Sequence, residues 1–523
     1  MKFSVFSDLE WTYPDTALTD RRSVELSCAK NGHTGFQLLG EALPEKSALQ
    51  ISMEWENEGD HPAVESFELI DIGVEENTGA KLYTTTDYES CKAFVTRKAP
   101  FRVYDCLRPP EGVLQGTRLA LYFRFTAPPE LSAGEHRGTL TVFAGEEKLS
   151  LPVRLQVYSA VIPKLPEAKL SFIHFFSYQN LALQEKAQPD TEEYWEAFRR
   201  YVRAQQELRC SAIMLPPGEA VFSPEGKISF DFSRAVRAAE IAFEEGIRKV
   251  CGCQIAKRRD APPYGYTLNW ETPGRKAETA SIERYFSTWR QIVAEKGWEG
   301  RVMQSLADEP QPYSAAAYRE LATCAREYLP GVPFLEAVET PNLGDALDIW
   351  IPKQVHYEEK REDYERLRAE GKTLWFYTCA FPAGPTMNRS MDLPLVQCRE
   401  VFWMGFFYDF TGFLHWGFNY HEGKDLWNFA CCEDPQSGKK FPAGDSNIVY
   451  PGKNGPWRSM RYEAQRGGVE DFELLRQLER KSPKEARDLV RRICTSFREY
   501  NTSASAFESN RRLLLEACEK LER

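Results

Sequence analysis

The stretch VMQSLADEPQP, residues 302–312, is an apolar strand pattern that ends abruptly in Asp308, Glu309 and Pro310. An acid followed by Glu and Pro can also cap a helix, and the next residues, YSAAAYRELATCAREYL, have helical periodicity. The choice between a helix cap and a functional pair of acids therefore depends on the fold around this stretch.

The same order of apolar strand and then helix recurs on both sides. Strand patterns are LSFIHFF, SAIMLP, KVCGCQI, FLEAVE, ALDIWIPKQ, TLWFYTC and GFLHWGFNY, and helical patterns span about 191–208, 231–246, 281–296, 357–370 and 394–407. Eight strands with intervening helices over roughly 250 residues predict a (β/α)8 TIM-type barrel, which we expect over residues 166–455.

The barrel favours a functional role for the acids. Catalytic groups of such barrels lie where strands end, and Asp308 and Glu309 end the fourth strand. Pro310 predicts an extended Glu309, so the acids should precede the helix rather than lie inside it.

Two further regions flank the predicted barrel. Residues 1–165 contain alternating patterns without helices, such as RLALYFRFTAP and GTLTVFAGEEKLSLPVRLQVY, and predict a β-sandwich domain. A proline-rich linker, VIPKLPEAK, follows at 161–169. Residues 456–523 predict a C-terminal helical extension packed on the barrel.

Charge and hydropathy exclude several classes of partner. Lys and Arg number 66 against 77 Asp and Glu, a net charge of −11 that disfavours nucleic acid and anionic membranes. No segment reaches 18 apolar residues, so membrane insertion is not expected. Without a signal-peptide pattern the sequence as written predicts a cytoplasmic protein, or a secreted or periplasmic one if a leader was removed. The 13 Cys, an odd number without CxxC pairs, fit reduced thiols.

The sequence predicts neither a metal site nor a cofactor. The seven His are scattered apart from His415 and His421, and HExxH, GxGxxG and GxxxxGK[ST] patterns are absent from the sequence.

Acids and aromatic residues at strand ends suggest a glycosidase acting on a carbohydrate substrate. Trp375, Tyr377 and Trp416 lie on the last two predicted strands, where each could contact a sugar or fill the barrel core. The common retaining design adds a nucleophilic carboxylate about 5 to 5.5 Å from the acid. The seventh strand and its loop contain no acid, which leaves Glu336 and Glu339 of the fifth strand as candidates.

Alternatively, the nucleophile belongs to the substrate. A 2-acetamido group can attack its own anomeric carbon, with an effective molarity of about 10⁵ to 10⁸ M when well oriented. One carboxylate then holds the acetamido N–H, and the other protonates the leaving oxygen. Because neighbouring carboxylates resist simultaneous ionisation, one retains a proton, and we expect Glu309 to hold it while Asp308 stays charged.

Three stretches carry a family resemblance: LADEP, the run WFYTCAFPAGPTMN to GFLHWGFNY, and GDSNIVYPGKNGPWRSMRYEAQRGGVEDFELL. Over roughly residues 170–480 the sequence resembles glycoside hydrolase family 123, the β-N-acetylgalactosaminidases, and the broader domain-of-unknown-function family 4091. The resemblance implies a β-sandwich before the barrel, Asp308 as the acetamido-orienting residue and Glu309 as the general acid/base. It also implies a tyrosine on the acetamido oxygen, for which Tyr377 is the candidate, and makes Trp375, Trp416 and Asn419 candidate sugar contacts. Apart from the resemblance, Glu336 of the fifth strand is a further candidate for substrate binding.

Three functions stay open at this point. The first is a retaining, substrate-assisted glycosidase that removes β-linked N-acetylgalactosamine (GalNAc) or a related 2-acetamido sugar. The second is a neutral-sugar β-glycosidase that uses Glu309 with Glu336 or Glu339. The third is a non-catalytic glycan-binding protein, which the retention of two mutually repelling acids argues against. In the same sequence, Arg461, Glu463, Arg466, Glu470 and Asp471 are expected to form structural ion pairs.

Overall fold

A computed structural model describes residues 2–272, 279–421, 423–434 and 437–521. The chain forms two compact units. Unit 1 comprises residues 1–169, 379–408 and 419–523, and unit 2 comprises residues 170–378 and 409–418. These units divide the chain differently from the three predicted segments, because residues 379–408 and 419–455 group with the N-terminal region.

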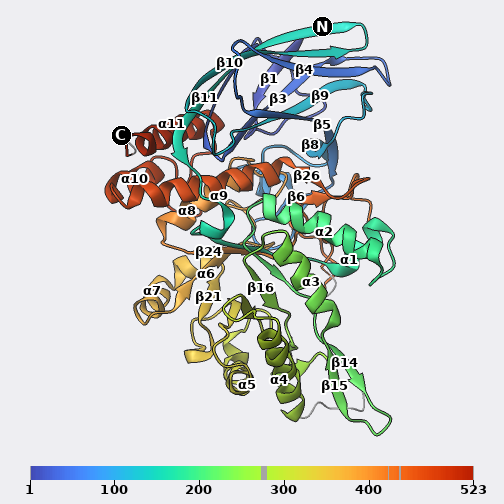
Figure 1. The fold of residues 1–523 in the computed structure, drawn as a ribbon, viewed down its shortest axis with the longest axis vertical. Coiled ribbons are helices and arrows are strands. Elements are labelled where there is room, and N and C mark those ends of the chain that lie inside the picture. Colours follow the sequence, from blue (N-terminus) through green and yellow to red (C-terminus); the bar gives the residue numbers. More distant parts are fainter. Residues whose placement is uncertain (1, 273–278, 422, 435–436, 522–523) are drawn as a thin grey trace. The chain divides into compact units, whose positions relative to one another are not determined.

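Unit 1 contains two large sheets (Figure 1). The strands of the first, in spatial order, are β1 (Phe3–Ser7), β3 (His33–Ala42), β9 (Arg118–Thr126), β5 (Ala63–Val74), β8 (Phe101–Arg108), β26 (Trp457–Ser459) and β25 (Val449–Tyr450). Those of the second are β2 (Val24–Lys30), β11 (Glu147–Val161), β10 (Gly134–Ala144) and β4 (Leu49–Trp55). All pairings are antiparallel except β11 with β2, so the predicted antiparallel β region is confirmed.

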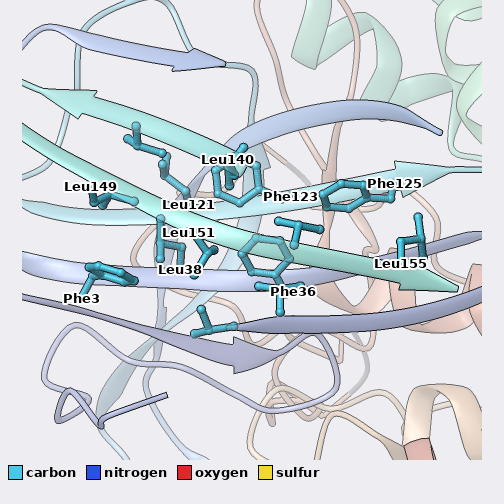
Figure 2. Packing of buried hydrophobic residues seen from close by; sticks show 14 of the residues in the cluster. Phe3, Phe36, Leu38, Leu121, Phe123, Phe125, Leu140, Leu149, Leu151 and Leu155 are labelled. Atoms are coloured by element: carbon cyan, nitrogen blue, oxygen red, sulfur yellow. The ribbon is translucent and has the colours of Figure 1, made fainter. Parts of the chain in front are cut away.

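The two sheets share one hydrophobic core, which Figure 2 shows. Alternate residues of β9, Leu121, Phe123 and Phe125, are buried in the same cluster as Leu149 and Leu151 of β11. The alternation follows from the two-residue period of a strand, which sends every second side chain to one face. This period is the pattern that the sequence shows.

Residues 449–459 were not expected in this sheet. The predicted barrel, residues 166–455, includes β25, but β25 pairs with β26, and β26 pairs with β8. The C-terminal region is otherwise helical, as predicted, in α9 (Met460–Glu479), α10 (Pro483–Arg491) and α11 (Ala504–Lys520). Its packing against the barrel stays a prediction.

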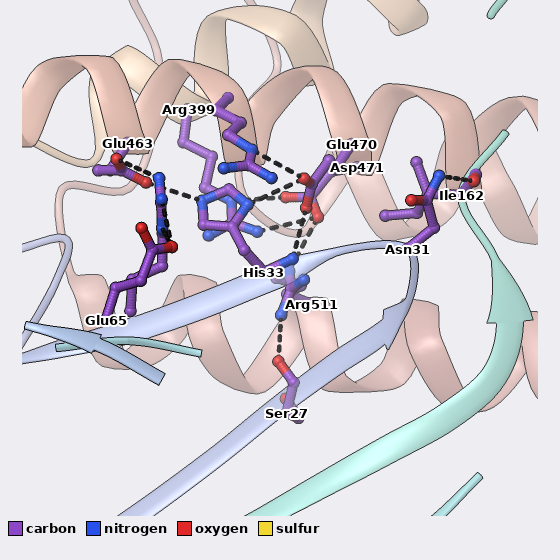
Figure 3. Close-up of polar contacts among 12 residues, drawn as sticks. Ser27, Asn31, His33, Glu65, Ile162, Arg399, Glu463, Glu470, Asp471 and Arg511 are labelled. Atoms are coloured by element: carbon purple, nitrogen blue, oxygen red, sulfur yellow. Dashed lines mark hydrogen bonds and ion pairs between the residues drawn. The ribbon is translucent and has the colours of Figure 1, made fainter. Parts of the chain in front are cut away.

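Buried ion pairs connect α9 to its neighbours within unit 1 (Figure 3). Asp471 accepts from Arg399 of α8 (Gln397–Phe407) at 2.7 Å and from Arg511 of α11 at 2.8 Å. Glu470 contacts the His33 ring at 2.9 Å, and Glu463 pairs with Arg124 at 3.1 Å. The prediction of structural ion pairing in this segment is confirmed.

Unit 2 alternates parallel strands with helices. Six strands form one sheet in the order β19 (Val302–Gln304), β16 (Lys249–Gly252), β13 (Ala212–Met214), β12 (Ser171–His174), β24 (Gly412–His415) and β23 (Phe376–Tyr377). Three more form a second sheet: β20 (Leu335–Val338), β21 (Ile349–Pro352) and β22 (Thr373–Leu374). Its helices are α1 (Tyr178–Glu185), α2 (Glu192–Glu207), α3 (Ser233–Glu244), α4 (Thr279–Glu295), α5 (Ala315–Tyr328), α6 (Gln354–Glu359) and α7 (Arg361–Ala369).

The two parallel sheets do not form one continuous closed barrel. Single parallel bridges connect them: Gln304 of β19 with Phe334, directly before β20, and Lys353, directly after β21, with Tyr377 of β23. The strand order across these bridges follows the chain, as the prediction requires. The sequence analysis did not foresee two antiparallel hairpins, β14–β15 (Glu219–Phe222 and Ile228–Asp231) and β17–β18 (Ala256–Arg259 and Gly265–Leu268).

Candidate active site

The two acids follow β19 in a turn that brings both toward the same region. β19 ends at Gln304, and Glu309 has a φ of +43°, in the left-handed region that L-residues rarely adopt. The prediction of an extended Glu309 is therefore wrong, because tertiary contacts override the local preference imposed by Pro310. The acids do precede the helix, since the 3-10 turn η3 begins at Pro312 and α5 begins at Ala315.

Arg258 of β17 holds the backbone of this turn. Its Nη1 donates to the carbonyl oxygen of Glu309 and lies 3.4 Å from that of Asp308, while Asp260 pairs with its Nε at 2.6 Å. Gln254 Nε2 approaches Asp308 Oδ1 at 3.5 Å. The hairpin thus supports an otherwise unfavourable backbone conformation.

The carboxylate of Glu309 meets side chains from two other strands. The Tyr377 hydroxyl at the end of β23 donates to Glu309 Oε1, and Lys353 Nζ, directly after β21, lies 3.0 Å from the same oxygen. Lys353 also pairs with Glu339, directly after β20. The four groups Glu309, Glu339, Lys353 and Tyr377 therefore gather at the carboxyl ends of four parallel strands, where barrel and doubly wound enzymes place their sites.

The electrostatics differ from the expectation for the acid pair. Desolvation by the surrounding protein, followed by repulsion from Glu309, raises the pKa of Asp308 to about 7, although Asp308 reaches solvent. Burial opposes the ionisation of Glu339, but Lys353 overcomes it and lowers the pKa of that carboxyl. The raised pKa argues against the expectation that Asp308 stays fully charged near neutral pH.

Glu336 lies beneath the acid-bearing loop. It is 2% exposed and accepts hydrogen bonds from Ser305 Oγ at 2.7 Å, from the amides of Leu306 and Ala307 at 2.9 and 3.0 Å, and from the Tyr318 hydroxyl at 3.1 Å. Burial raises the pKa of Glu336 to about 8. These contacts make Glu336 a support for the loop, and its contact with substrate stays a prediction.

The predicted aromatic contacts fall in different environments. Trp375 is buried between β22 and β23, against Gly412, so it packs within the sheet. Trp416 is half-buried just after β24, whose neighbour β23 carries Tyr377. Asn419 belongs to unit 1, where it bridges to Asn447. As sugar contacts, all three stay predictions.

Lys353 and Arg258 were missed by the sequence analysis. Lys353 directly follows the predicted strand ALDIWIP, so a charged residue at a strand end was the available signal. Arg258 had no such signal, because its hairpin was not predicted.

Within the described ranges the chain contains neither a metal-binding cluster nor a membrane-spanning helix. No group of three or more His, Cys, Asp or Glu side chains there is arranged to hold a metal ion. Nor does any helix in those ranges combine the length and apolarity needed to cross a membrane.

Paired acids at the carboxyl ends of parallel strands are a site arrangement that glycoside hydrolases use. Residues 219–478 match the family model described as "Glycoside hydrolase 123, catalytic domain", and through this segment the chain belongs to glycoside hydrolase family 123. Among curated proteins, none matches the sequence.

Solved structures support the fold. A family 123 glycoside hydrolase from Clostridium perfringens, whose description concerns glycolipid glycan hydrolysis, superposes with a TM-score of 0.72 at 13% identity, over 99% of this chain and 97% of that one. A family 39 glycoside hydrolase from Bacteroides cellulosilyticus WH2 gives 0.35 at 12% identity, over 82% of each chain. A GH10 xylanase from termite gut gives 0.34 at 11% identity, over 86% of this chain and 100% of that one. The last two superpositions are too weak to inform on this chain.

Proposed function

We propose that the protein is a retaining, substrate-assisted glycosidase that removes terminal β-linked GalNAc through an oxazolinium intermediate. One observation carries the proposal: both acids that could serve as an enzyme nucleophile are already held by other groups of the protein. Glu336 is buried under the loop, and Glu339 is paired with Lys353. A nucleophile supplied by the substrate is consistent with this arrangement. We also propose that the two N-terminal sheets form a β-sandwich, and that the nine parallel strand segments, with β22 and β23 as two parts of one strand, form a (β/α)8 barrel.

In this mechanism the acetamido oxygen attacks the anomeric carbon while Glu309 protonates the leaving oxygen. Asp308 accepts a hydrogen bond from the acetamido N–H and stabilises the positive charge of the oxazolinium ring. Glu309 then removes a proton from the water that opens the ring, so the anomeric configuration is retained. Tyr377, which donates to Glu309, is the candidate to contact the acetamido oxygen.

The raised pKa of Asp308 fits one proton shared by the pair before substrate binds. An acetamido N–H that donates to Asp308 favours its charged form. Substrate binding would then transfer the shared proton to Glu309, where the leaving group needs it.

The test is hydrolysis of an aryl β-N-acetylgalactosaminide by the wild type and by Glu309→Gln and Asp308→Asn. Each variant should lose about 10² to 10⁴ in kcat/KM. The matched control, Glu320→Gln on the exposed face of α5, should retain wild-type activity.

A second test uses an inhibitor: a thiazoline fused across C1 and C2 of GalNAc should inhibit the wild type. Its failure to inhibit would favour a neutral-sugar mechanism, and glycan binding without turnover would favour a binding protein. The glycolipid glycans named for the Clostridium perfringens relative are the first natural substrates to test.

A further inference from the structure

Two tyrosines near the acid pair expose unusually large aromatic surfaces. Tyr264, between β17 and β18, is 48% exposed, and Tyr313 in η3 is 45% exposed. Their ring centroids lie 4.8 Å apart with an interplanar angle of 40°. Exposed aromatic surface of this kind marks a binding site more often than isolated apolar residues do.

Polar contacts fix this pair in place. The Tyr313 hydroxyl donates to Asp260 Oδ1 at 2.7 Å, and the Tyr266 hydroxyl of β18 lies 3.1 Å from Ser314 Oγ. The β17–β18 hairpin and η3 are thereby linked at two points. Because the Tyr313 hydroxyl is held, the orientation of its ring is set before a ligand arrives, which reduces the entropy lost on binding.

The same contacts lead to the catalytic turn. Asp260, which holds Tyr313, pairs with Arg258, and Arg258 donates to the carbonyl oxygen of Glu309. Tyr313 is four residues from Glu309, so their backbones lie within about 14 Å of each other even for an extended chain. A sugar of the leaving group, next to the oxygen that Glu309 would protonate, could therefore reach Tyr313.

We infer that Tyr264 and Tyr313 form a subsite for a neutral sugar of the leaving group, which packs its C–H face on the exposed rings. The inference rests on the proposed function, since it takes Glu309 as the acid that protonates this leaving group. A neutral sugar is favoured because the charged groups beside the rings, Arg258 and Asp260, are already paired with each other.

The test compares two substrates for each enzyme variant: methyl β-GalNAc and a disaccharide of β-GalNAc linked to galactose. In Tyr264→Ala, the ratio of kcat/KM for the disaccharide to kcat/KM for the methyl glycoside should fall about 3- to 10-fold, the range of a lost aromatic contact. Tyr264→Phe, which keeps the ring, should hold the ratio within about twofold. So should Phe222→Ala, which removes an exposed aromatic ring from the other hairpin. An unchanged ratio in Tyr264→Ala would overturn the subsite.

A binding measurement separates this inference from the proposed function. If the wild type hydrolyses neither substrate, the proposed activity fails, but the subsite can still be tested with lactose as a neutral disaccharide probe. Saturation-transfer NMR should detect lactose on the wild type and show a weaker signal on Tyr264→Ala, with Phe222→Ala as the control. Equal signals on all three proteins would overturn the subsite.

Discussion

The ammonium of Lys353 lies 3.0 Å from the carboxylate of Glu309, and it also pairs with Glu339. One buried cation thus contacts both the proposed acid/base, Glu309, and a second carboxylate, Glu339.

Removing this cation should impair activity and move its pH dependence. Burial and the charge of Glu309 raise the pKa of Asp308, and the positive charge of Lys353 partly offsets this rise. In Lys353→Met, Asp308 should therefore titrate at higher pH, and the loss of kcat/KM on the alkaline side should shift upward with it. We expect kcat/KM at neutral pH to fall about 10- to 100-fold, because two carboxylates lose a buried partner. Lys353→Arg, which keeps the charge, should recover part of the activity, and an unshifted pH profile in Lys353→Met would contradict the account.

The raised pKa of Asp308 predicts a specific pH dependence of stability. A carboxyl with a pKa of about 7 in the folded protein and 3.8 as its ordinary value binds more protons when folded between those pH values. The free energy of unfolding should therefore decrease as pH rises from about 4 to 7, because Asp308 ionises at a cost in the folded protein. Asp308→Asn cannot ionise, so it should raise Tm at pH 8 and change it little at pH 4. Because Asp308 is exposed, solvent screening limits the gain to about 1 kcal/mol, or about 1 °C for a chain of 523 residues. Equal Tm changes at both pH values would argue against the shift.

Arg258 should act on geometry rather than on substrate affinity. Arg258→Met removes the donor that holds the Asp308–Glu309 backbone, where Glu309 has a φ of +43°. A small displacement of a catalytic group can cost about 100-fold in rate, so kcat for methyl β-GalNAc should fall by up to that factor with little change in KM. Lys257→Met, one residue earlier on the same hairpin, serves as the control. A rise in KM with kcat preserved would instead indicate a direct substrate contact.

A substitution of Glu336 tests whether this residue supports the acid-bearing loop or acts as the nucleophile. Glu336→Gln keeps a buried polar side chain of similar size but has one acceptor oxygen fewer for the four donors around it. The loss should be about 1 to 3 kcal/mol in stability, with kcat within about tenfold of wild type. Urea unfolding and steady-state kinetics measure both. Loss of activity by more than about 10⁴ with unchanged stability would revive Glu336 as the nucleophile.

Much of this site could be predicted from local patterns. The end of an apolar strand at Gln304 and the carboxylates after it located the acid pair, because strand ends and side-chain types are local properties of the sequence. Tyr377 was found by the same reasoning. Lys353 and Arg258 depend on which strand ends and hairpins lie together, which is a tertiary property. The φ of Glu309 and the raised pKa of Asp308 likewise arise from contacts that no single segment encodes. The same limit applies to β26, a short strand whose partner β8 lies more than 300 residues earlier in the chain, and to β25, which pairs with β26.

Ion pairs in unit 1 should contribute to stability according to their burial. Asp471 is fully buried with two arginines, so Asp471→Ala should cost about 3 to 5 kcal/mol in the free energy of unfolding, because it leaves both guanidinium groups without their acid. The exposed pair of Asp488 with Arg491, at 3.0 Å, gives the control, since Asp488→Ala should cost less than about 1 kcal/mol. Urea denaturation of both variants makes the comparison, and equal losses would contradict it.

The central claim is that the nucleophile is the substrate's own acetamido oxygen. The most direct measurement is kcat for aryl β-galactosaminides whose N-acetyl group carries zero, one, two or three fluorine atoms. Fluorine withdraws electron density from the attacking oxygen, so the account predicts that log kcat falls steadily with each added fluorine. A kcat that does not depend on fluorination would contradict substrate assistance and assign the attack to a group of the enzyme.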